Sequence, residues 1–554
     1  MRSYVYNSIP VVKHKRSKFD LSHRVGTTIN VGDLVPIDWQ EVYPGDTFKC
    51  DMSAVAQITS TFHKVPLDNL MLDVYHFFVP FRIVDDNFVR IMGESKTKWT
   101  DSGVYSVPIC RGSTTYTSLS LADYLGIPKE ACGSSTSTFS QYPFRCYAKI
   151  YNDYFRDENL CEEINVQSTI SSPAINNGAF AVNNIFGMPA KAPKKHDYFT
   201  SALPAPQKGS AVEISVGSVP AETITVTTSP DRFGGVNTYP IYFKSTAEGQ
   251  NDLWNKAACF GGTSASAEGV LSVSDTTLPI SQEITSIYPT NLIAEYGGSS
   301  LESISVNDMR MAFQTQRILE RAARSGSRYV EYLLSAFGVQ SGDARLQRAE
   351  YLGGRSIPIN IHGVEQTSGG DSTTAPLGQI AGQSTSFGRA GYIKSFVEHG
   401  IVMAICCIRQ LHTYSQGIAP KWKRINRYDF YDPNFAFLGE QPIYKNEIYA
   451  SGGSQDVFGY KEAWSELRFV PNSVTGLLRP SVSQSLALWN FADNYVSAPL
   501  LSKDFIEEKP DFVDRALTVP SKTAPQFLLD TWFDMTAVRV LPTYSVPGLI
   551  DHTM

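Results

Sequence analysis

Strand-like segments lie near both ends of this chain, and helix-like patterns lie only in the stretches between them. Segments with alternating or continuous apolar residues, as expected of β-strands, are residues 28–37, 47–60, 70–79, 356–361, 391–397, 401–412 and 466–470. Segments with helical periodicity are residues 84–92, 153–163, 308–324 and 328–337. Because strands and helices do not alternate along the chain, a parallel α/β sheet is excluded. This order predicts a mainly β protein with antiparallel strands.

The long connections narrow the choice of β architecture. An antiparallel sandwich or barrel with helix-containing loops accommodates them, and the eight-stranded jelly-roll barrel is the best-known fold of this kind. The composition agrees, since 40 Gly, 31 Pro, 28 Tyr and 30 Phe are typical of strands, turns and long loops. A hydrophobic fraction of 42% is sufficient for a large core. We therefore expect a jelly-roll barrel with helical loops and a polar, β-rich insertion.

Cysteine usage and hydropathy indicate a reducing, aqueous compartment. The eight Cys are too sparse for a disulfide scaffold and form no CxxC motif. Cys406 and Cys407 are neighbours in an expected strand, so their side chains point to opposite faces and do not bond each other. The longest apolar run, residues 401–408, is far shorter than the about 18 residues that a membrane span needs. With no signal-peptide pattern at the N-terminus, the sequence predicts a soluble cytoplasmic protein without a membrane segment.

Motifs for catalysis and cofactor binding are missing from the sequence. HExxH, a GxGxxG following a strand, a phosphate-binding Walker loop and GxSxG do not occur. His399 and Cys406 lie an odd number of residues apart, hence on opposite faces of a strand, and Cys406 and His412 are about 20 Å apart along one. We therefore predict no catalytic residues, no cofactor and no metal.

An acidic stretch between residues 209 and 299 accounts for the net charge. It holds nine acidic and three basic residues, a balance equal to the net charge of −6 of the whole chain. Its short alternating runs of Ser, Thr and Val predict small solvated strands, which favours a separate outward-facing module over an ordinary long loop. The expected regions are a basic arm (1–24), the first part of the barrel (25–208), the acidic insertion (209–299) and the second part with helical loops (300–554).

The first 24 residues are basic. Six bases, among them Lys13, Lys15, Arg16 and Lys18, oppose the single acid Asp20. Basic arms bind polyanions because neutralised phosphates release counterions, although a solvated, frayed terminus has the same composition.

The expected helix 308–324 carries a row of arginines. Arg310, Arg317, Arg321, Arg324 and Arg328 fall within a band of about 60° if the helix continues past residue 325. Such a stripe is either a solvated face paired with acids or a contact surface for a neighbouring subunit or a phosphate chain. Arginine without lysine favours contact, because the guanidinium binds carboxylate and phosphate with two hydrogen bonds.

Residues 409–428 combine bases and aromatic rings without an acid. The bases are Arg409, Lys421, Lys423, Arg424 and Arg427, and the rings between them are His412, Tyr414, Trp422 and Tyr428. Cations for phosphates beside rings for bases suit single-stranded nucleic acid. A loop whose rings pack inward and whose bases face water is the alternative.

Seven strings in fixed order resemble the major capsid protein of gokushoviruses, which are bacteriophages of the Microviridae with circular single-stranded DNA. They are FDLSH (19–23), YPGD (43–46), HFFVPFR (76–82), KHDYFTSALPAPQKG (195–209), RAEYLGG (348–354), YDFYDP (428–433) and SVPGL (545–549). The resemblance runs from about residue 19 to the C-terminus, and it departs from the family in the acidic stretch after Gly209, where members differ widely.

The resemblance implies a single jelly roll and a T=1 shell of sixty copies in the virion, assembled in the cytoplasm of a bacterial host. It also implies an internal scaffolding protein, a minor pilot protein and a host-cell surface receptor as partners, and it places the insertion in protrusions at the threefold axes.

With this resemblance, the charged segments take specific roles. The expected DNA contacts are Lys13, Lys15, Arg16, Lys18, Lys421, Trp422, Lys423, Arg424 and Arg427, and the expected subunit contacts are the five arginines of the stripe. Host recognition is assigned to the insertion, with Glu222, Asp231, Trp254 and Glu268 as candidates. A carbohydrate-binding adhesive β-sandwich, monomeric or of small oligomeric size, is the alternative from a different class.

Overall fold

A computed structural model describes most of the chain and divides it into two compact units. The described residues are 15–94, 105–111, 118–131, 137–166, 187–210, 212, short strands between 226 and 294, 306–326, 328–365, 367, 380–450 and 456–544. The first unit comprises Met1–Ser210 and Ile318–Met554, and the second comprises Ala211–Arg317. The helix Val306–Ser325 crosses this division.

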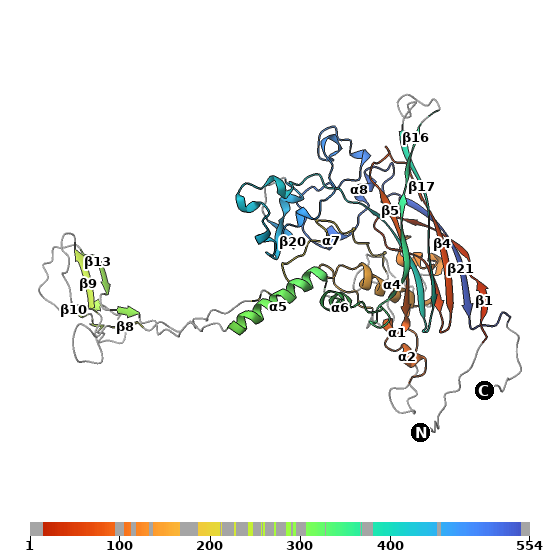
Figure 1. Ribbon diagram of the computed structural model, residues 1–554, viewed down its shortest axis with the longest axis horizontal. Helices are drawn as coiled ribbons and strands as arrows, with labels where there is room; N and C mark the ends of the chain where they lie inside the picture. Colours follow the sequence, from red (N-terminus) through yellow and green to blue (C-terminus); the bar gives the residue numbers. More distant parts are fainter. Residues whose placement is uncertain are drawn as a thin grey trace, which may run out of the picture. The chain divides into compact units, whose positions relative to one another are not determined.

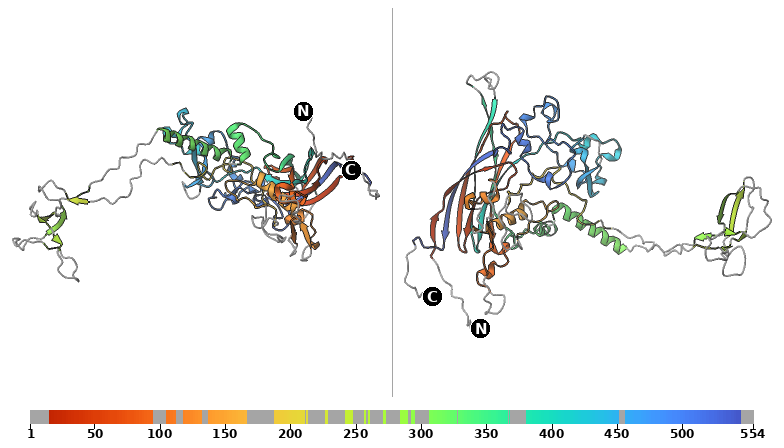
Figure 2. Two further views of the ribbon diagram at one scale, coloured as in Figure 1. Left: turned by 90° about the horizontal axis from the view of Figure 1, so that it is seen from below. Right: turned by 180° about the vertical axis from the view of Figure 1, so that it is seen from behind.

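Two antiparallel sheets form the centre of the first unit (Figures 1 and 2). The larger sheet contains β1 (Ser17–Asp20), β2 (His23–Ile29), β4 (Thr47–Ile58), β16 (Ile361–Glu365), β17 (Ile380–Ser395) and β21 (Phe527–Arg539). Its order is β1-β21-β4-β17-β16, with β2 also paired to β21. The smaller sheet has the order β15-β5-β18-β3, formed by β3 (Val35–Val42), β5 (Leu70–Pro80), β15 (Glu350–Ile359) and β18 (Gly400–Gln410). Among the described strands, neither sheet closes into a barrel, so the expected closure is wrong and the fold is an antiparallel two-sheet structure.

The main core fills the space between the two sheets. Alternate residues of each strand contribute to it, as in β4, where Phe48, Cys50 and Met52 are buried while the residues between them are exposed. This two-residue period is the expected signature of a strand with one buried face. The Cys50 thiol lies in this core, and burial raises its pKa to about 12.

The smaller sheet is buried on its other face as well. Helix α4 (Tyr142–Ile150) and the π-helical turn Tyr151–Phe155 pack there, and a second apolar cluster joins them to β5 and β18. In β18, Cys406 faces the space between the sheets and Cys407 faces α4, so the vicinal cysteines do point to opposite faces. Burial on both faces explains why β5 and β18 are apolar almost throughout.

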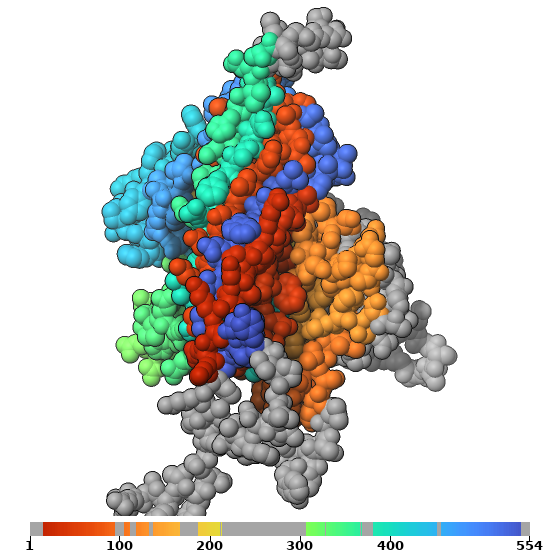
Figure 3. Space-filling model, turned by 90° about the vertical axis from the view of Figure 1, so that its right-hand side faces the viewer, coloured from red at the N-terminus to blue at the C-terminus, as the bar shows by residue number. Residues whose placement is uncertain are grey.

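The larger sheet, in contrast, has an open face. Figure 3 looks onto this face, where the red, blue and green bands of β1, β2, β4, β21 and β17 lie uncovered by a helix. Its outward residues include the half-exposed Trp532, Phe387, which is 61% exposed, and Ile393, which is 71% exposed. Arg24 and Asp530 form an ion pair at 2.7 Å across β2 and β21 on this face.

Three expected elements differ in position from the observed ones. The expected strand 28–37 is interrupted after Ile29. At Gly32 the backbone adopts a φ of +87°, and a Cβ atom there would lie 2.3 Å from the carbonyl oxygen of Glu508, so only glycine fits this position. The expected helix 84–92 consists of two short helices, α1 (Phe81–Val84) and α2 (Phe88–Ile91). The expected helix 153–163 is misplaced: α4 begins at Tyr142, and the π-helical turn that follows it ends at Phe155, so only the first three residues of the expected helix are helical.

One expected strand is absent, and several observed strands were not expected. Residues 466–470 contain a 3₁₀ turn (Ser465–Leu467), and Leu467, Phe469 and Val470 are exposed. The longest of the unexpected strands is β21, which lies inside the larger sheet and pairs with β1, β2 and β4. The expected strands 47–60, 70–79 and 401–412 are confirmed as β4, β5 and β18.

The helical connections have the expected places. Helices α5 (Val306–Ser325) and α6 (Tyr329–Phe337) are separated by Gly326, whose φ of +87° ends α5. Short elements of other loops are β6 (Ile109–Arg111), α3 (Leu121–Tyr124), β7 (Thr138–Ser140), β19 (Glu440–Tyr444), β20 (Val457–Glu462), α7 (Lys503–Ile506) and α8 (Asp511–Asp514). In the part of the chain that is described, every helix is too short or too polar to cross a bilayer.

The second unit contains short antiparallel strands. They are β8 (Val226–Thr228), β9 (Tyr242–Ala247), β10 (Lys256–Ala257), β11 (Cys259–Phe260), β12 (Leu271–Ser272), β13 (Ile284–Pro289) and β14 (Leu292–Ala294). The largest of its sheets has the order β10-β9-β13. Small strands are what the alternating polar runs of this segment predict.

Candidate nucleic-acid and subunit interfaces

The described part of the basic arm runs along the edge of the larger sheet. Lys15, Arg16 and Lys18 are exposed, and Lys18 lies in β1 opposite Val538 of β21. Lys13 lies outside the described residues. The three described bases are thus available to an anion beside the open face.

The loop from Lys421 to Arg427 exposes only some of its bases. Lys421, Trp422 and Arg427 are exposed, with Trp422 at 77%. Lys423 donates a hydrogen bond to Asn446, and burial lowers its pKa. Arg424 is 3.0 Å from Glu466 in an ion pair. Two of the four cations therefore stabilise the loop itself.

A cavity lies against this loop and is called the loop pocket here. It has a volume of about 320 Å³ and is lined by the buried rings of Tyr198, Phe199 and Tyr414 and by Lys421 and Arg424. The side chain of Glu447 in its wall accepts a hydrogen bond of 3.1 Å from Tyr198, and burial raises the pKa of this carboxyl. The loop pocket is largely apolar, with charge at its edge.

The arginines of the expected stripe have different surroundings. Arg310, Arg317 and Arg321 lie in α5 and are exposed. Arg324 forms ion pairs with Glu440 and Glu462, of which the second measures 3.6 Å.

Arg328 lies outside α5. It precedes α6, pairs with Glu331 at 3.3 Å and donates to the carbonyl oxygens of Asn152 and Arg156 at 3.2 and 2.7 Å. The helix ends before this residue, so the condition for a five-residue stripe is not met, and Arg328 stabilises its own chain.

The four candidates for host recognition, Glu222, Asp231, Trp254 and Glu268, lie outside the described residues. Their roles stay predictions.

His412 belongs to a buried charge network. Its Nδ1 is 2.8 Å from Asp493 and its Nε2 is 3.1 Å from Glu508, with both carboxylates fully buried. Burial lowers the pKa of His412, but the two carboxylates outweigh this and raise it to about 9. His412 is therefore an internal cation, and it is unavailable to nucleic acid. Lys194 and Tyr495 also contact Asp493, at 3.6 and 2.6 Å.

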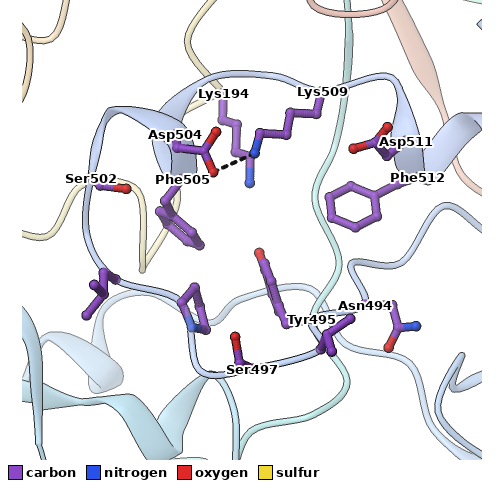
Figure 4. Close-up of a pocket in the computed structure, with 13 residues that line it drawn as sticks. Lys194, Asn494, Tyr495, Ser497, Ser502, Asp504, Phe505, Lys509, Asp511 and Phe512 are labelled. Atoms are coloured by element: carbon purple, nitrogen blue, oxygen red, sulfur yellow. Dashed lines mark ion pairs between the residues drawn. The ribbon is translucent and has the colours of Figure 1, made fainter. Parts of the chain in front are cut away.

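Two further cavities flank the segment from Pro193 to His196. The first, of about 350 Å³, is drawn in Figure 4 and is called the Lys509 pocket. Figure 4 shows the side chains of Lys194 and Lys509 pointing into the space among the rings of Tyr495, Phe505 and Phe512. The Lys194 ammonium is 4.5 Å from the centre of the Phe505 ring.

The second cavity, the aromatic pocket, has a volume of about 480 Å³. Its lining consists of Tyr75, Phe77, Tyr154, Phe155, Tyr351, Pro193, Lys194, Lys195, His196 and Arg409. The aromatic pocket lies on the same face of the smaller sheet as α4. Phe77 and Phe155 from its lining belong to the apolar cluster that joins α4 to this sheet.

Comparison with known proteins decides the family. The model of the family described as Capsid protein (F protein) matches residues 7–549. Capsid protein VP1 of Spiroplasma virus 4 is 38% identical over 543 residues, which cover 96% of this chain and 95% of the relative.

The chain belongs to the phage F capsid protein family. Capsid protein VP1 of Bdellovibrio phage phiMH2K is 38% identical over 98% of this chain and 97% of its own length, and that of Chlamydia phage 1 is 33% identical over the same shares. The resemblance to capsid proteins of the Microviridae is thereby confirmed, and the chain is a structural protein of a bacteriophage virion. This finding favours the capsid protein over the adhesive β-sandwich.

For this capsid protein, sequence reasoning found the exposed charges but missed the cavities. The five rings and the four bases of the aromatic pocket come from segments near residues 75, 154, 195, 351 and 409. Three of these segments, near residues 75, 195 and 351, lie within strings that carry the family resemblance. Spacing in one dimension gives no signal that such segments meet, because strand pairing brings them together.

Proposed function

We propose that the chain is the major capsid protein of a T=1 shell of sixty copies, which encloses a circular single-stranded DNA genome and presents a host-recognition insertion. The observation that carries the proposal is the amount of apolar surface on the loops. Exposed there are Trp422, Ile425, Tyr428, Phe430, Phe437, Leu438, Phe469, Val470, Leu477, Val496 and Leu500. Many large apolar side chains exposed on loops favour contacts with other proteins.

The strand order supports a jelly roll as the architecture of the subunit. Numbered along the chain, the eight principal strands are β2, β3, β4, β5, β15, β17, β18 and β21. They pair in the orders β2-β21-β4-β17 and β3-β18-β5-β15. Each strand is followed along the chain by a strand of the other sheet, except that β5 is followed by its own neighbour β15. Two Greek keys wound in this way are the pattern of a jelly roll, a frequent fold of viral shells.

The loops are suited to symmetric assembly. Closed symmetry repeats each contact at every axis, so contacts that are modest singly are large in sum. The exposed arginines Arg310, Arg317 and Arg321 and the partly paired Arg324 are proposed contacts at such axes, with carboxylates of a neighbouring copy as their partners.

Genome contact is assigned to the exposed bases of the arm and the loop. Lys15, Arg16, Lys18, Lys421 and Arg427 are free of ion pairs within the described residues. Trp422 offers a ring for stacking, and Lys13 extends the arm. Lys423 and Arg424, which have partners within the chain, act by holding the loop in shape.

The insertion is proposed as the host-recognition module, with a cell-surface receptor as its partner. A separate compact unit at Ala211–Arg317 supports this, because such a unit tolerates variation without change to the sheets. Assembly in the bacterial cytoplasm with an internal scaffolding protein and a minor pilot protein completes the proposal.

Particle formation tests the shell. The full chain co-expressed with its scaffolding partner should give hollow particles of uniform diameter by electron microscopy. A chain that stays a monomer or small oligomer under these conditions contradicts the proposal.

Packaging and attachment test the assigned surfaces separately. Alanine at Lys421, Trp422, Lys423 and Arg424 should give intact particles with little DNA, and normal DNA content contradicts the loop assignment. Replacement of residues 209–299 by a short linker should abolish adsorption to cells while the sheets still fold. Normal adsorption contradicts the assignment of the insertion to attachment, and a failure of assembly shows instead that contacts between copies of the module are needed for the shell.

A further inference from the structure

The aromatic pocket differs from every other described cavity in its chemistry. Its rings are in mutual contact: the ring centres of Phe77 and Tyr154 are 4.8 Å apart, those of Tyr75 and Phe155 are 5.4 Å apart, and those of Phe77 and Tyr351 are 5.6 Å apart. Tyr351 nevertheless remains 47% exposed. The pocket therefore offers a preformed aromatic wall with an accessible ring.

Strand register explains how the rings meet. Tyr75 and Phe77 are alternate residues of β5, so both point to the face of the smaller sheet away from the other sheet. Tyr351 of β15 is paired with Phe77, and Arg409 of β18 is on the same face. The π-helical turn after α4 adds Tyr154 and Phe155 from above the sheet. The rings and the guanidinium are thus held by regular elements.

The charges around these rings are mostly positive. Arg409 pairs with the buried Asp73 at 2.5 Å and donates to the Tyr75 hydroxyl at 2.6 Å, which fixes its position. Lys195 lies 3.8 Å from the same carboxylate, and His196 at the edge is exposed. Asp73 is thus shared by two cations, and the lining contains no acid among the described residues. Lys194 also lines the pocket but pairs with the buried Asp493 at 3.6 Å, so an anion that enters meets one cation in excess of Asp73.

The other two cavities lack this combination. In the Lys509 pocket, Asp504 pairs with Lys509 at 2.7 Å (Figure 4), and Lys194 pairs with Asp493 at 3.6 Å, so acids offset both lysines. In the loop pocket, Glu447 and Glu466 accompany Lys421 and Arg424. Rings together with net positive charge occur only in the aromatic pocket among these three.

We propose that the aromatic pocket binds a nucleotide of single-stranded DNA, with the base against Tyr351 and the phosphate beside Lys195 and His196. Stacking on a ring serves any base, and cations serve any backbone, so binding without sequence preference is expected. The volume of about 480 Å³ lies in the range of small-ligand sites. This inference rests on the proposed enclosure of a genome, and it adds a DNA contact remote in sequence from the arm and the loop.

The first experiment locates DNA inside intact particles. Particles are grown with 5-bromodeoxyuridine in the genome and irradiated, and the cross-linked peptides are identified by mass spectrometry. We expect cross-links to peptides that contain Tyr351 or His196. Particles that hold DNA but cross-link only through other segments overturn this inference and leave the proposed function intact. Particles without DNA contradict the proposed function itself.

The second experiment measures binding of labelled oligo(dT) to the purified full-length protein. Tyr351→Ala should weaken binding about five- to 100-fold through loss of stacking, and Tyr351→Phe should restore it because the ring is retained. Lys195→Gln should lower the slope of log K against log salt by about 0.7, the value for one phosphate of a single strand. Tyr544→Ala and Lys49→Gln, exposed residues of the same types elsewhere, are the matched controls.

Competition and folding controls complete the test. Thymidine monophosphate should compete with oligo(dT) more strongly than inorganic phosphate does, because the pocket contacts both ring and phosphate. Equal effects of Tyr351→Ala and Tyr544→Ala in variants with unchanged thermal unfolding, or equal competition by phosphate, overturn the proposal.

Discussion

The two sheets of the subunit are made of similar residues but differ in what covers them. The smaller sheet lies between the main core and the cluster around α4, so β5 and β18 are buried on both faces. The larger sheet has the core on one side and an open face on the other, where Trp532, Phe387 and Ile393 are exposed. A shell subunit needs both kinds of surface, since it must be rigid inside and available to partners outside.

The two sheets therefore differ in what their outer side chains do: one set stabilises the fold, and the other is available for contacts with other molecules. Side chains on the covered face of the smaller sheet contribute through burial, at roughly 25 cal/mol per Å² of apolar surface. Side chains on the open face contribute little to the folding stability of the isolated subunit. They contribute to binding when another molecule covers them. The following predictions test this division.

The largest effect is expected from isoleucine truncation on the two sheets. Ile405→Ala, at a position 1% exposed in β18, should lower the free energy of unfolding by about 2–5 kcal/mol because it leaves a cavity. Ile393→Ala in β17, 71% exposed, should change it by no more than about 0.5 kcal/mol. Urea unfolding of both variants measures the difference, and equal losses would refute the division between the sheets.

A smaller effect is expected from two histidines with raised pKa values. His412, just after β18, has its pKa raised to about 9 by Asp493 and Glu508 against the effect of burial. Stabilisation by this cation is complete below its unfolded pKa of 6.5 and is lost as pH rises through about 9. Stability should therefore fall by an amount on the order of 1–3 kcal/mol between pH 6.5 and pH 9.5.

His23 on the larger sheet is the comparison for His412. A hydrogen bond to Asp38 also raises the pKa of His23 to about 9, but its side chain is partly exposed, at 30%. We expect His412→Asn to flatten the pH dependence of unfolding more than His23→Asn does, because solvent screens the exposed pair. If His23→Asn flattened the pH dependence of unfolding more than His412→Asn, burial would not be the cause of the difference between the two histidines.

The smallest effect on stability is expected from Trp532→Ala. Half of this residue is exposed on the open face, so truncation should lower the stability of the subunit by at most about 1 kcal/mol. The yield of particles should fall more than the stability, if a partner covers this face in the shell. A loss of stability as large as that of Ile405→Ala would mean that the face is not open in the subunit.

The sequence predicted strands correctly where the apolar residues either alternated or ran continuously. The alternation in β4 and the continuous apolar runs of β5 and β18 identified strands buried on one and on two faces. It missed α4, a helix of nine residues whose period is marked by only two charged residues, Arg145 and Lys149. The strand β21 does alternate, with Phe527, Leu529 and Phe533 inward, and that signal could have found it.

The candidate sites followed the same rule. Lys421, Trp422 and Arg427 are exposed, and their role as a contact surface stays a prediction. The internal roles of Arg328 and His412 depend on distant partners such as Asn152 and Asp493. A sequence shows which residues are charged, but it does not show which of them lie close enough in space to form ion pairs.

By itself, the sequence determined the antiparallel β class, the helical loops, the acidic insertion and, through its ordered strings, the capsid family. These depend on local periodicity, composition and order along the chain. Only the tertiary structure decided that the sheets stay open, that one has a free face, that His412 is an internal cation and that five rings and four bases line one pocket. Those features arise from contacts between segments far apart in the chain, and such contacts are fixed by the fold as a whole.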